Sequence, residues 1–115
     1  MNIIIGSDHA GYDLKELCKD HLLQSGEHQV KDVGVFNRDS SDYPRIAQEV
    51  AGAVSRGEYD RGVLICGTGI GMSITANRFK GVRAALCQDV YCAKMTRLHN
   101  NANVLSMGGR IVGPG

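Results

Sequence analysis

The 115-residue chain is predicted to fold as α/β, a single doubly wound, Rossmann-like three-layer sandwich with a five-stranded parallel sheet. Short apolar runs alternate with amphipathic segments of about ten residues or more, the pattern of βαβ units. Right-handed crossovers between parallel strands place helices on both faces of such a sheet. No repeat or linker-like stretch divides the chain, so we expect one domain over residues 1–115.

The first half of the chain predicts two strands and two helices. Residues 2–6 form an apolar run closed by glycine, typical of a buried parallel strand. Residues 13–23 have helical spacing of apolar side chains, and Gly26 ends that helix. Residues 29–33 are the second predicted strand. Pro44 lies near the first turn of the next helix. The expected apolar stripes are Leu14, Leu17, Cys18, His21 and Leu22 in the first helix, and Ile46, Ala47, Val50, Ala51 and Val54 in the second.

The second half predicts three strands and two helices. Residues 62–66 are apolar throughout, so this strand is expected near the centre of the sheet. A helix over 69–77 follows a glycine turn. A strand over 82–86, a helix over 89–98 and a strand over 103–106 complete the pattern.

Composition and charge exclude several classes of partner. Thirteen basic residues against twelve acidic ones give a net charge of +1, so no global field favours nucleic acid or a membrane surface. The start of the chain leads directly into a strand, so we expect a cytoplasmic protein without a signal peptide. The four cysteines have neither CxxC spacing nor a histidine cluster, which indicates free thiols and no metal site.

The strongest chemical signal is Cys66 and the loop Gly67-Thr68-Gly69-Ile70-Gly71 that follows it. Glycines at a helix start expose backbone N–H groups that can cradle an anion. The alternative is a tight strand-to-helix turn that needs glycine for steric reasons. Cys66 itself is either a small buried hydrophobe or a thiol activated by the helix N-terminus, suited to act as a nucleophile or base. Its position favours catalysis.

Polar residues near other element ends are further candidates, because ligands bind beyond the carboxyl ends of parallel strands. Asp8 and His9 follow the first strand, and the alternative for Asp8 is a cap of the next helix. His99 and Asn100 end the helix before the last strand, where a surface cation and a turn residue are the alternatives. For Arg110 the alternative to a site role is an ordinary surface ion pair. For Tyr43 the alternative is a half-buried aromatic ring with no role in the site. Their joint placement at element ends favours a shared site.

Together these residues resemble ribose-5-phosphate isomerase type B, of the ribose/galactose phosphate isomerase family. The resemblance covers essentially the whole chain. It is carried by five segments: Gly6-Ser7-Asp8-His9-Ala10-Gly11, Asp42-Tyr43-Pro44, Ile65-Cys66-Gly67-Thr68-Gly69-Ile70-Gly71, Arg97 to Leu105 and Gly108 to Gly113. The resemblance implies interconversion of ribose 5-phosphate and ribulose 5-phosphate in the pentose phosphate pathway, through a cis-enediolate and with no metal or organic cofactor.

The resemblance also implies roles for individual residues. Cys66 corresponds to the base that moves a proton between C2 and C1, and His99 to the acid/base that opens the furanose ring. The backbone of Gly67, Thr68, Gly69, Ile70 and Gly71 corresponds to the anion hole, with Thr68 assisting. Contacts to sugar hydroxyls are expected from Asp8 and Asn100, phosphate-side contacts from His9 and Arg110, and a place near the substrate pocket for Tyr43.

Some members use a glutamate of the following helix as base. Thr75 stands in that region here, which places this sequence with the cysteine users. The family continues for about another helix beyond the length of this chain, so we expect that helix to be lacking. The resemblance implies a homodimer or tetramer with sites between subunits. Two alternatives stay open: a hexose-6-phosphate isomerase acting on allose or galactose 6-phosphate, and a phosphosugar-binding module without catalysis.

Overall fold

Five parallel strands form one sheet in a computed structural model that describes residues 1–35 and 43–109. The strands are β1 (Asn2–Ser7), β2 (Gln29–Asp32), β3 (Arg61–Cys66), β4 (Ala84–Leu86) and β5 (Val104–Gly108). Their order across the sheet is β2-β1-β3-β5-β4, and each neighbouring pair is parallel. The apolar run predicted to be central is β3, the middle strand.

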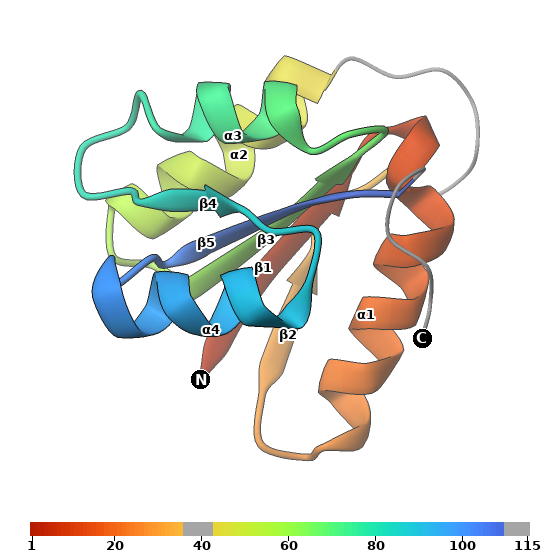
Figure 1. Cartoon of the computed structure of the whole chain (residues 1–115). Helices are drawn as coiled ribbons and strands as arrows, with labels where there is room; N and C mark the ends of the chain where they lie inside the picture. Colours follow the sequence, from red (N-terminus) through yellow and green to blue (C-terminus); the bar gives the residue numbers. More distant parts are fainter. Residues whose placement is uncertain (36–42, 110–115) are drawn as a thin grey trace.

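Helices cover both faces of this sheet, which confirms the predicted three-layer sandwich (Figure 1). The helices are α1 (Tyr12–Gln24), α2 (Tyr43–Ser55), α3 (Ile70–Ala76) and α4 (Val90–His99), with a short 3-10 helix, η1 (His9–Gly11), before α1. In Figure 1, α2 and α3 lie together on one face, and α1 and α4 lie on the other. No helix in the described ranges is both long and apolar enough to cross a membrane.

The main core lies between the sheet and the pair α2 and α3. The apolar stripe predicted for the second helix is buried there, with Ile46 and Val50 fully enclosed. Ile4 and Leu64 project from β1 and β3 into the same cluster. Alternate residues of a strand point to opposite faces, so Ile3 and Val63 face α1 and α4 instead.

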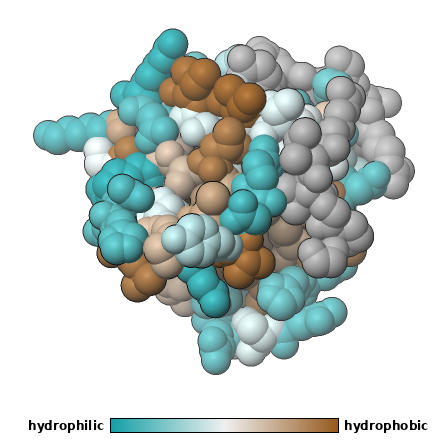
Figure 2. Space-filling view, viewed as in Figure 1, coloured by the Kyte–Doolittle hydropathy of each residue, from teal (hydrophilic) through white to brown (hydrophobic). Residues whose placement is uncertain are grey.

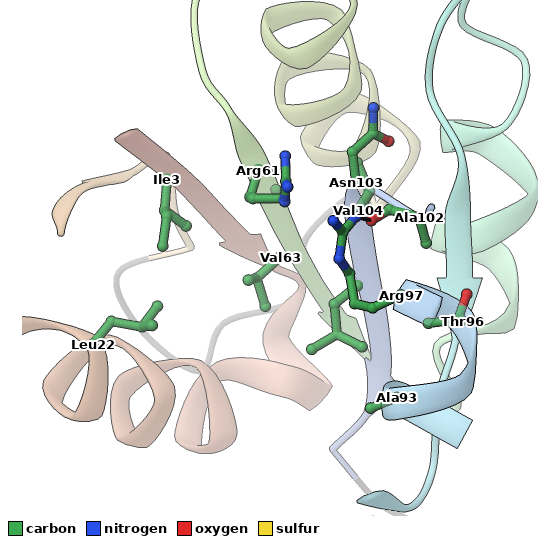
Figure 3. Close-up of a pocket in the computed structure, with 12 residues that line it drawn as sticks. Ile3, Leu22, Arg61, Val63, Ala93, Thr96, Arg97, Ala102, Asn103 and Val104 are labelled. Atoms are coloured by element: carbon green, nitrogen blue, oxygen red, sulfur yellow. Dashed lines mark hydrogen bonds between the residues drawn. The ribbon is translucent and has the colours of Figure 1, made fainter. Parts of the chain in front are cut away.

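That second face contains an apolar hollow of about 210 Å³ between α1 and α4. Figure 3 shows Leu22 and Ala93 from the two helices, with Ile3 and Val63 from strands between them. The hollow is also lined by Asn103, just before β5, and therefore lies toward the amino ends of the strands. Ligand sites of this fold class lie at the opposite, carboxyl ends.

Three sequence predictions require correction in detail. The helix after Cys66 begins and ends one residue inside the predicted 69–77, and the fourth strand begins at Ala84, after a turn, instead of at residue 82. The predicted stripe of α1 is also partly wrong. Leu17 is 51% exposed. Lys15 is fully buried and ion-paired, although hydrophobic periodicity predicts a polar surface residue at its position.

Candidate active site

The end of β3 places a buried thiol directly under a backbone loop. Cys66 is the last residue of β3, is 6% exposed and packs at the border of the main core. The Gly69 N–H donates a hydrogen bond to Cys66 Sγ at 3.0 Å. A hydrogen bond to sulfur stabilises negative charge on it, which is what a thiol needs to act as a base.

The loop between β3 and α3 is Gly67-Thr68-Gly69, because α3 begins at Ile70. The glycine motif over 67–71 therefore includes this loop and the first turn of α3, to which Ile70 and Gly71 belong. Gly69 has φ +84°, a left-handed conformation that other residues adopt at a cost. Thr68 is exposed, and its hydroxyl accepts a hydrogen bond from the Ile70 N–H at 3.2 Å.

The end of β5 lies against this loop with almost no space between the backbones. A Cβ at Gly108 would be 2.7 Å from the carbonyl carbon of Thr68. The Gly109 N–H donates to the Cys66 carbonyl oxygen at 2.6 Å. Glycine at these positions is therefore required by close approach, and it fixes the loop relative to the sheet.

The end of β1 brings Asp8 and His9 to the same edge. Asp8 is mostly buried, and its N–H donates to the Ile65 carbonyl oxygen at 3.1 Å. Its carboxylate also caps η1, accepting a hydrogen bond from the Gly11 N–H at 3.1 Å. The capping alternative is thus confirmed, and it orients the carboxylate at this edge. His9 is the first residue of η1.

A buried ion pair supports the backbone just before Asp8. Lys15 is fully buried and donates to both oxygens of Asp32, at 2.9 and 3.0 Å. Asp32 also accepts the Gly34 N–H at 2.9 Å. The Gly34 carbonyl in turn accepts the Ser7 N–H at 2.7 Å. This chain of contacts ties the segment after β2 to the end of β1.

Two residues that contact the loop after Cys66 were not predicted from the sequence. Gln88 follows β4, and its amide donates to the Thr68 carbonyl oxygen at 2.8 Å. Ser106 of β5 donates to the Gly69 carbonyl oxygen at 2.6 Å. A signal for Gln88 was present, since it too follows a strand at the carboxyl edge, but an isolated glutamine carries no chemical motif.

Within one chain the structure does not bring His99 and Asn100 to this cluster, and under the expectation of sites between subunits a partner chain would supply them. The helix α4 runs from the carboxyl edge back toward the amino edge before β5 begins (Figure 1). Its end is held there, because Arg83, the residue before β4, donates a guanidinium hydrogen bond to the Asn101 carbonyl oxygen at 2.8 Å. Both His99 and Asn100 are exposed at that opposite edge.

Two further candidates cannot be placed in the site. Tyr43 begins α2, as predicted, but its side chain lies outside what the structure describes. Arg110 is likewise outside the described residues. Their roles stay predictions.

The other three cysteines differ in environment from Cys66. Burial raises the pKa of the Cys18 thiol, and burial together with nearby Cys92 and Asp89 raises the pKa of Cys87. Cys92 is exposed, so it is not a core residue, and its hydrogen bond to Asp89 raises its pKa. Among the described residues, no group of His, Cys, Asp or Glu is arranged to hold a metal ion.

The cluster at the carboxyl edge therefore combines a thiol, a hydrogen-bonded carboxylate and a loop of backbone N–H groups. A base beside N–H donors can remove a proton from a carbon acid while the donors stabilise the oxyanion that results.

Known proteins with related sequences and structures place this cluster in context. The sequence model of a family described as Ribose/Galactose Isomerase matches residues 3–115. Ribose-5-phosphate isomerase B of Escherichia coli is 48% identical over 96% of this chain and 74% of its own length. D-erythrulose-4-phosphate isomerase 2 of Mycolicibacterium smegmatis is 48% identical over 98% of this chain and 76% of its own. The structure of Clostridium thermocellum ribose-5-phosphate isomerase B superposes with a TM-score of 0.96 and 51% identity, over 99% of this chain and 76% of that one.

Proposed function

The chain belongs to the ribose/galactose isomerase family of sugar phosphate isomerases, and on that premise we propose that it interconverts ribose 5-phosphate and ribulose 5-phosphate through a cis-enediolate. The observation that carries the proposal is the Cys66 sulfur held 3.0 Å from the Gly69 N–H at the carboxyl edge of the sheet. The similar sequence from E. coli and the similar structure from C. thermocellum bear the name of this reaction.

In the proposed step the Cys66 thiolate removes the proton from C2 of the open-chain aldose. The electron pair of that C–H bond forms the C1–C2 double bond, and the carbonyl electrons move onto O1 to give the enediolate. The thiol then returns the proton to C1, and transfer of a hydroxyl proton between the two oxygens completes the ketose. The step needs no redox partner, metal or organic cofactor.

The residues around Cys66 suit the charge that develops in this step. The Gly69 and Ile70 N–H groups already donate within the loop, to Cys66 Sγ and Thr68 Oγ1. The other backbone N–H groups from Gly67 to Gly71 would stabilise the enediolate oxygens, a contribution typically worth about 10²–10³-fold per donor. Asp8 and His9 reach the same edge and would contact the sugar and its phosphate. Thr68 is exposed beside them and would assist at the oxygens.

We extend the proposal to a homo-oligomer in which a second copy completes each site. His99 and Asn100 are exposed at the edge opposite Cys66, so opening of the furanose ring by His99 requires another chain. Figure 2 shows apolar side chains over α3 and along α4. Ile70 and Ile74 of α3 are half exposed beside the catalytic loop, and Val90 and Leu98 of α4 are more exposed still. Such apolar surface is typical of a face covered by another subunit.

Replacement of the thiol tests the chemical step. We expect Cys66→Ala to lower kcat for ribose 5-phosphate by about 10²–10⁴-fold. Cys92→Ala is the matched control, because it removes an exposed thiol outside the site and should leave kcat unaltered. A Cys66→Ala enzyme with wild-type turnover would exclude Cys66 as the base. Binding of ribose 5-phosphate without isomerisation by the wild-type chain would favour the non-catalytic alternative.

Subunit complementation tests the composite site. Cys66→Ala and His99→Ala homodimers should each be inactive, whereas a mixed dimer has one site with both residues intact. After unfolding and refolding a 1:1 mixture, random pairing should restore about a quarter of wild-type activity. No recovery in a mixture shown to contain mixed dimers would refute the composite site.

The substrate itself requires comparison, because the M. smegmatis relative is named for a four-carbon phosphate and the family description includes galactose. We expect the highest kcat/KM on ribose 5-phosphate among erythrulose 4-phosphate, ribose 5-phosphate and the 6-phosphates of allose and galactose. A higher value on another sugar would reassign the substrate and leave the isomerase chemistry in place.

A further inference from the structure

We propose that Gln88 is a positioning residue for Cys66, acting through the peptide bond between Thr68 and Gly69. The Gln88 side-chain amide donates to the Thr68 carbonyl oxygen at 2.8 Å. The Gly69 N–H, which belongs to the same peptide unit, donates to Cys66 Sγ at 3.0 Å. One peptide plane therefore links the glutamine to the sulfur.

The geometry of a trans peptide makes this link rigid. Its carbonyl and N–H lie in one plane and point in opposite directions. Holding the Thr68 carbonyl toward Gln88 consequently turns the Gly69 N–H toward Cys66. Rotation of this plane about its flanking bonds would withdraw the N–H from the sulfur. Glycine at 69 makes such rotation easy, because it lacks the steric limits of other residues.

Gln88 is itself held at the other end of its amide. The Gly108 N–H donates to Gln88 Oε1 at 3.3 Å. Gly108 lies against the Thr68 backbone, where an added Cβ would be 2.7 Å away. The side chain thus connects the loop after β3 with the end of β5, and its donor group is fixed toward the Thr68 carbonyl.

Donation to a peptide carbonyl also polarises the peptide and strengthens its N–H as a donor. We therefore expect Gln88 both to orient and to strengthen the hydrogen bond that stabilises charge on the Cys66 sulfur. The consequence for catalysis rests on the proposed function, in which Cys66 is the base. The effect on the hydrogen bond to the sulfur does not depend on the proposed function, and it can be measured without substrate.

The test is the rate at which iodoacetamide alkylates Cys66 in the whole chain at neutral pH, followed by mass spectrometry of the Cys66 peptide. Gln88→Met keeps the side-chain length and removes both hydrogen bonds. We expect alkylation of Cys66 to slow by about tenfold, the effect of weakening one hydrogen bond to a charged group. A purely structural role predicts the opposite sign, since loosening of the fold would expose this buried thiol and speed its alkylation.

Asn77→Leu is the matched control. Asn77 also bridges backbone with its side-chain amide, donating to the Ala84 carbonyl at 2.9 Å and accepting the Ala84 N–H at 2.8 Å. Both variants lose two hydrogen bonds between a side-chain amide and the backbone, and both should lower the thermal unfolding midpoint. Only Gln88→Met should slow alkylation of Cys66. An unchanged or faster rate in Gln88→Met, or equal slowing in Asn77→Leu, would overturn the proposal.

If Gln88→Met folds poorly, a second variant tests the same proposal. Gln88→Glu retains the length and the acceptor for the Gly108 N–H but lacks the donor to Thr68, so it should also slow alkylation by about tenfold or more. In the isomerase assay, kcat should fall by a similar factor while KM stays constant. Slowed alkylation together with an inactive wild-type chain would refute the proposed function and leave the role of Gln88 standing.

Discussion

Asp32→Asn removes the charge from a carboxylate that several donors surround. Asp32 ends β2, and its side chain is 11% exposed. It accepts hydrogen bonds from Lys15, the Gly34 N–H and Lys19, all between 2.9 and 3.0 Å. The variant removes the nearest negative charge from the ammonium group of Lys15, which is fully buried.

The cost of that change follows from the burial of the pair. Removing one partner of a buried ion pair typically destabilises a protein by about 3–5 kcal/mol. Asn retains one acceptor oxygen, and Glu16 lies 3.5 Å from the Lys15 ammonium. We therefore expect a loss at the lower end, about 3 kcal/mol in the free energy of unfolding at neutral pH.

The pH dependence gives a second, independent signature. Burial raises the pKa of Asp32, but hydrogen bonds from Lys15, the Gly34 N–H and Lys19 outweigh it and hold the pKa below 3.8. A carboxyl whose folded-state pKa is lowered stabilises the fold above its unfolded-state pKa. This stabilisation is lost as the pH falls through the folded-state pKa. The difference between wild type and variant should therefore be largest at neutral pH and shrink below about pH 4.

Urea unfolding followed by circular dichroism at several pH values measures both effects. Glu58→Gln is the matched control, because it makes the same change in the exposed pair with Arg56 and should leave stability unaltered. The reasoning would be refuted if Asp32→Asn unfolded at the wild-type urea concentration at neutral pH. A deficit that persisted unchanged in acid would refute its electrostatic origin.

Two further substitutions test the site and its surroundings. Gly69→Ala should destabilise the fold by about 1–3 kcal/mol and abolish isomerisation, because its φ is +84° and the added Cβ would lie 2.8 Å from the Met107 carbonyl carbon; thermal unfolding and turnover measure this, and a fully active variant would contradict it. Asp89→Asn should speed alkylation of Cys92 at mildly alkaline pH, because the Asp89 carboxylate raises the Cys92 pKa above 9.0; peptide mass spectrometry measures this, and an unchanged rate would contradict it.

The number of strands, the layers and the central strand could be predicted from the sequence, because these features follow from apolar periodicity. The run at 62–66 and the stripe of Ile46 and Val50 are buried as predicted. Periodicity failed at Lys15, since a buried ion pair places a charged residue where the pattern expects an apolar one. It also could not give the lengths of α3 and β4, which depend on turns fixed by tertiary contacts.

The candidate site was predictable to the extent that it follows strand ends. Cys66 and Asp8 are close because parallel strands end at one edge. The separation of His99 from Cys66 within one chain could not be predicted, because it depends on the direction of α4, which returns toward the amino edge. Gln88 was missed because its importance comes from a contact with the Thr68 carbonyl, and such a contact has no signature in the sequence.

The strand order has a consequence for how the chain folds. The strand β5 lies between β3 and β4, although it is the last of the five in sequence. During synthesis, therefore, β4 emerges before the strand that joins it to the sheet, and β3 has an open edge until β5 inserts. Open edges of this kind invite pairing with other chains. Because Gly108 and Gly109 also fix the loop after Cys66, the Cys66 thiol acquires its native surroundings only at this late step.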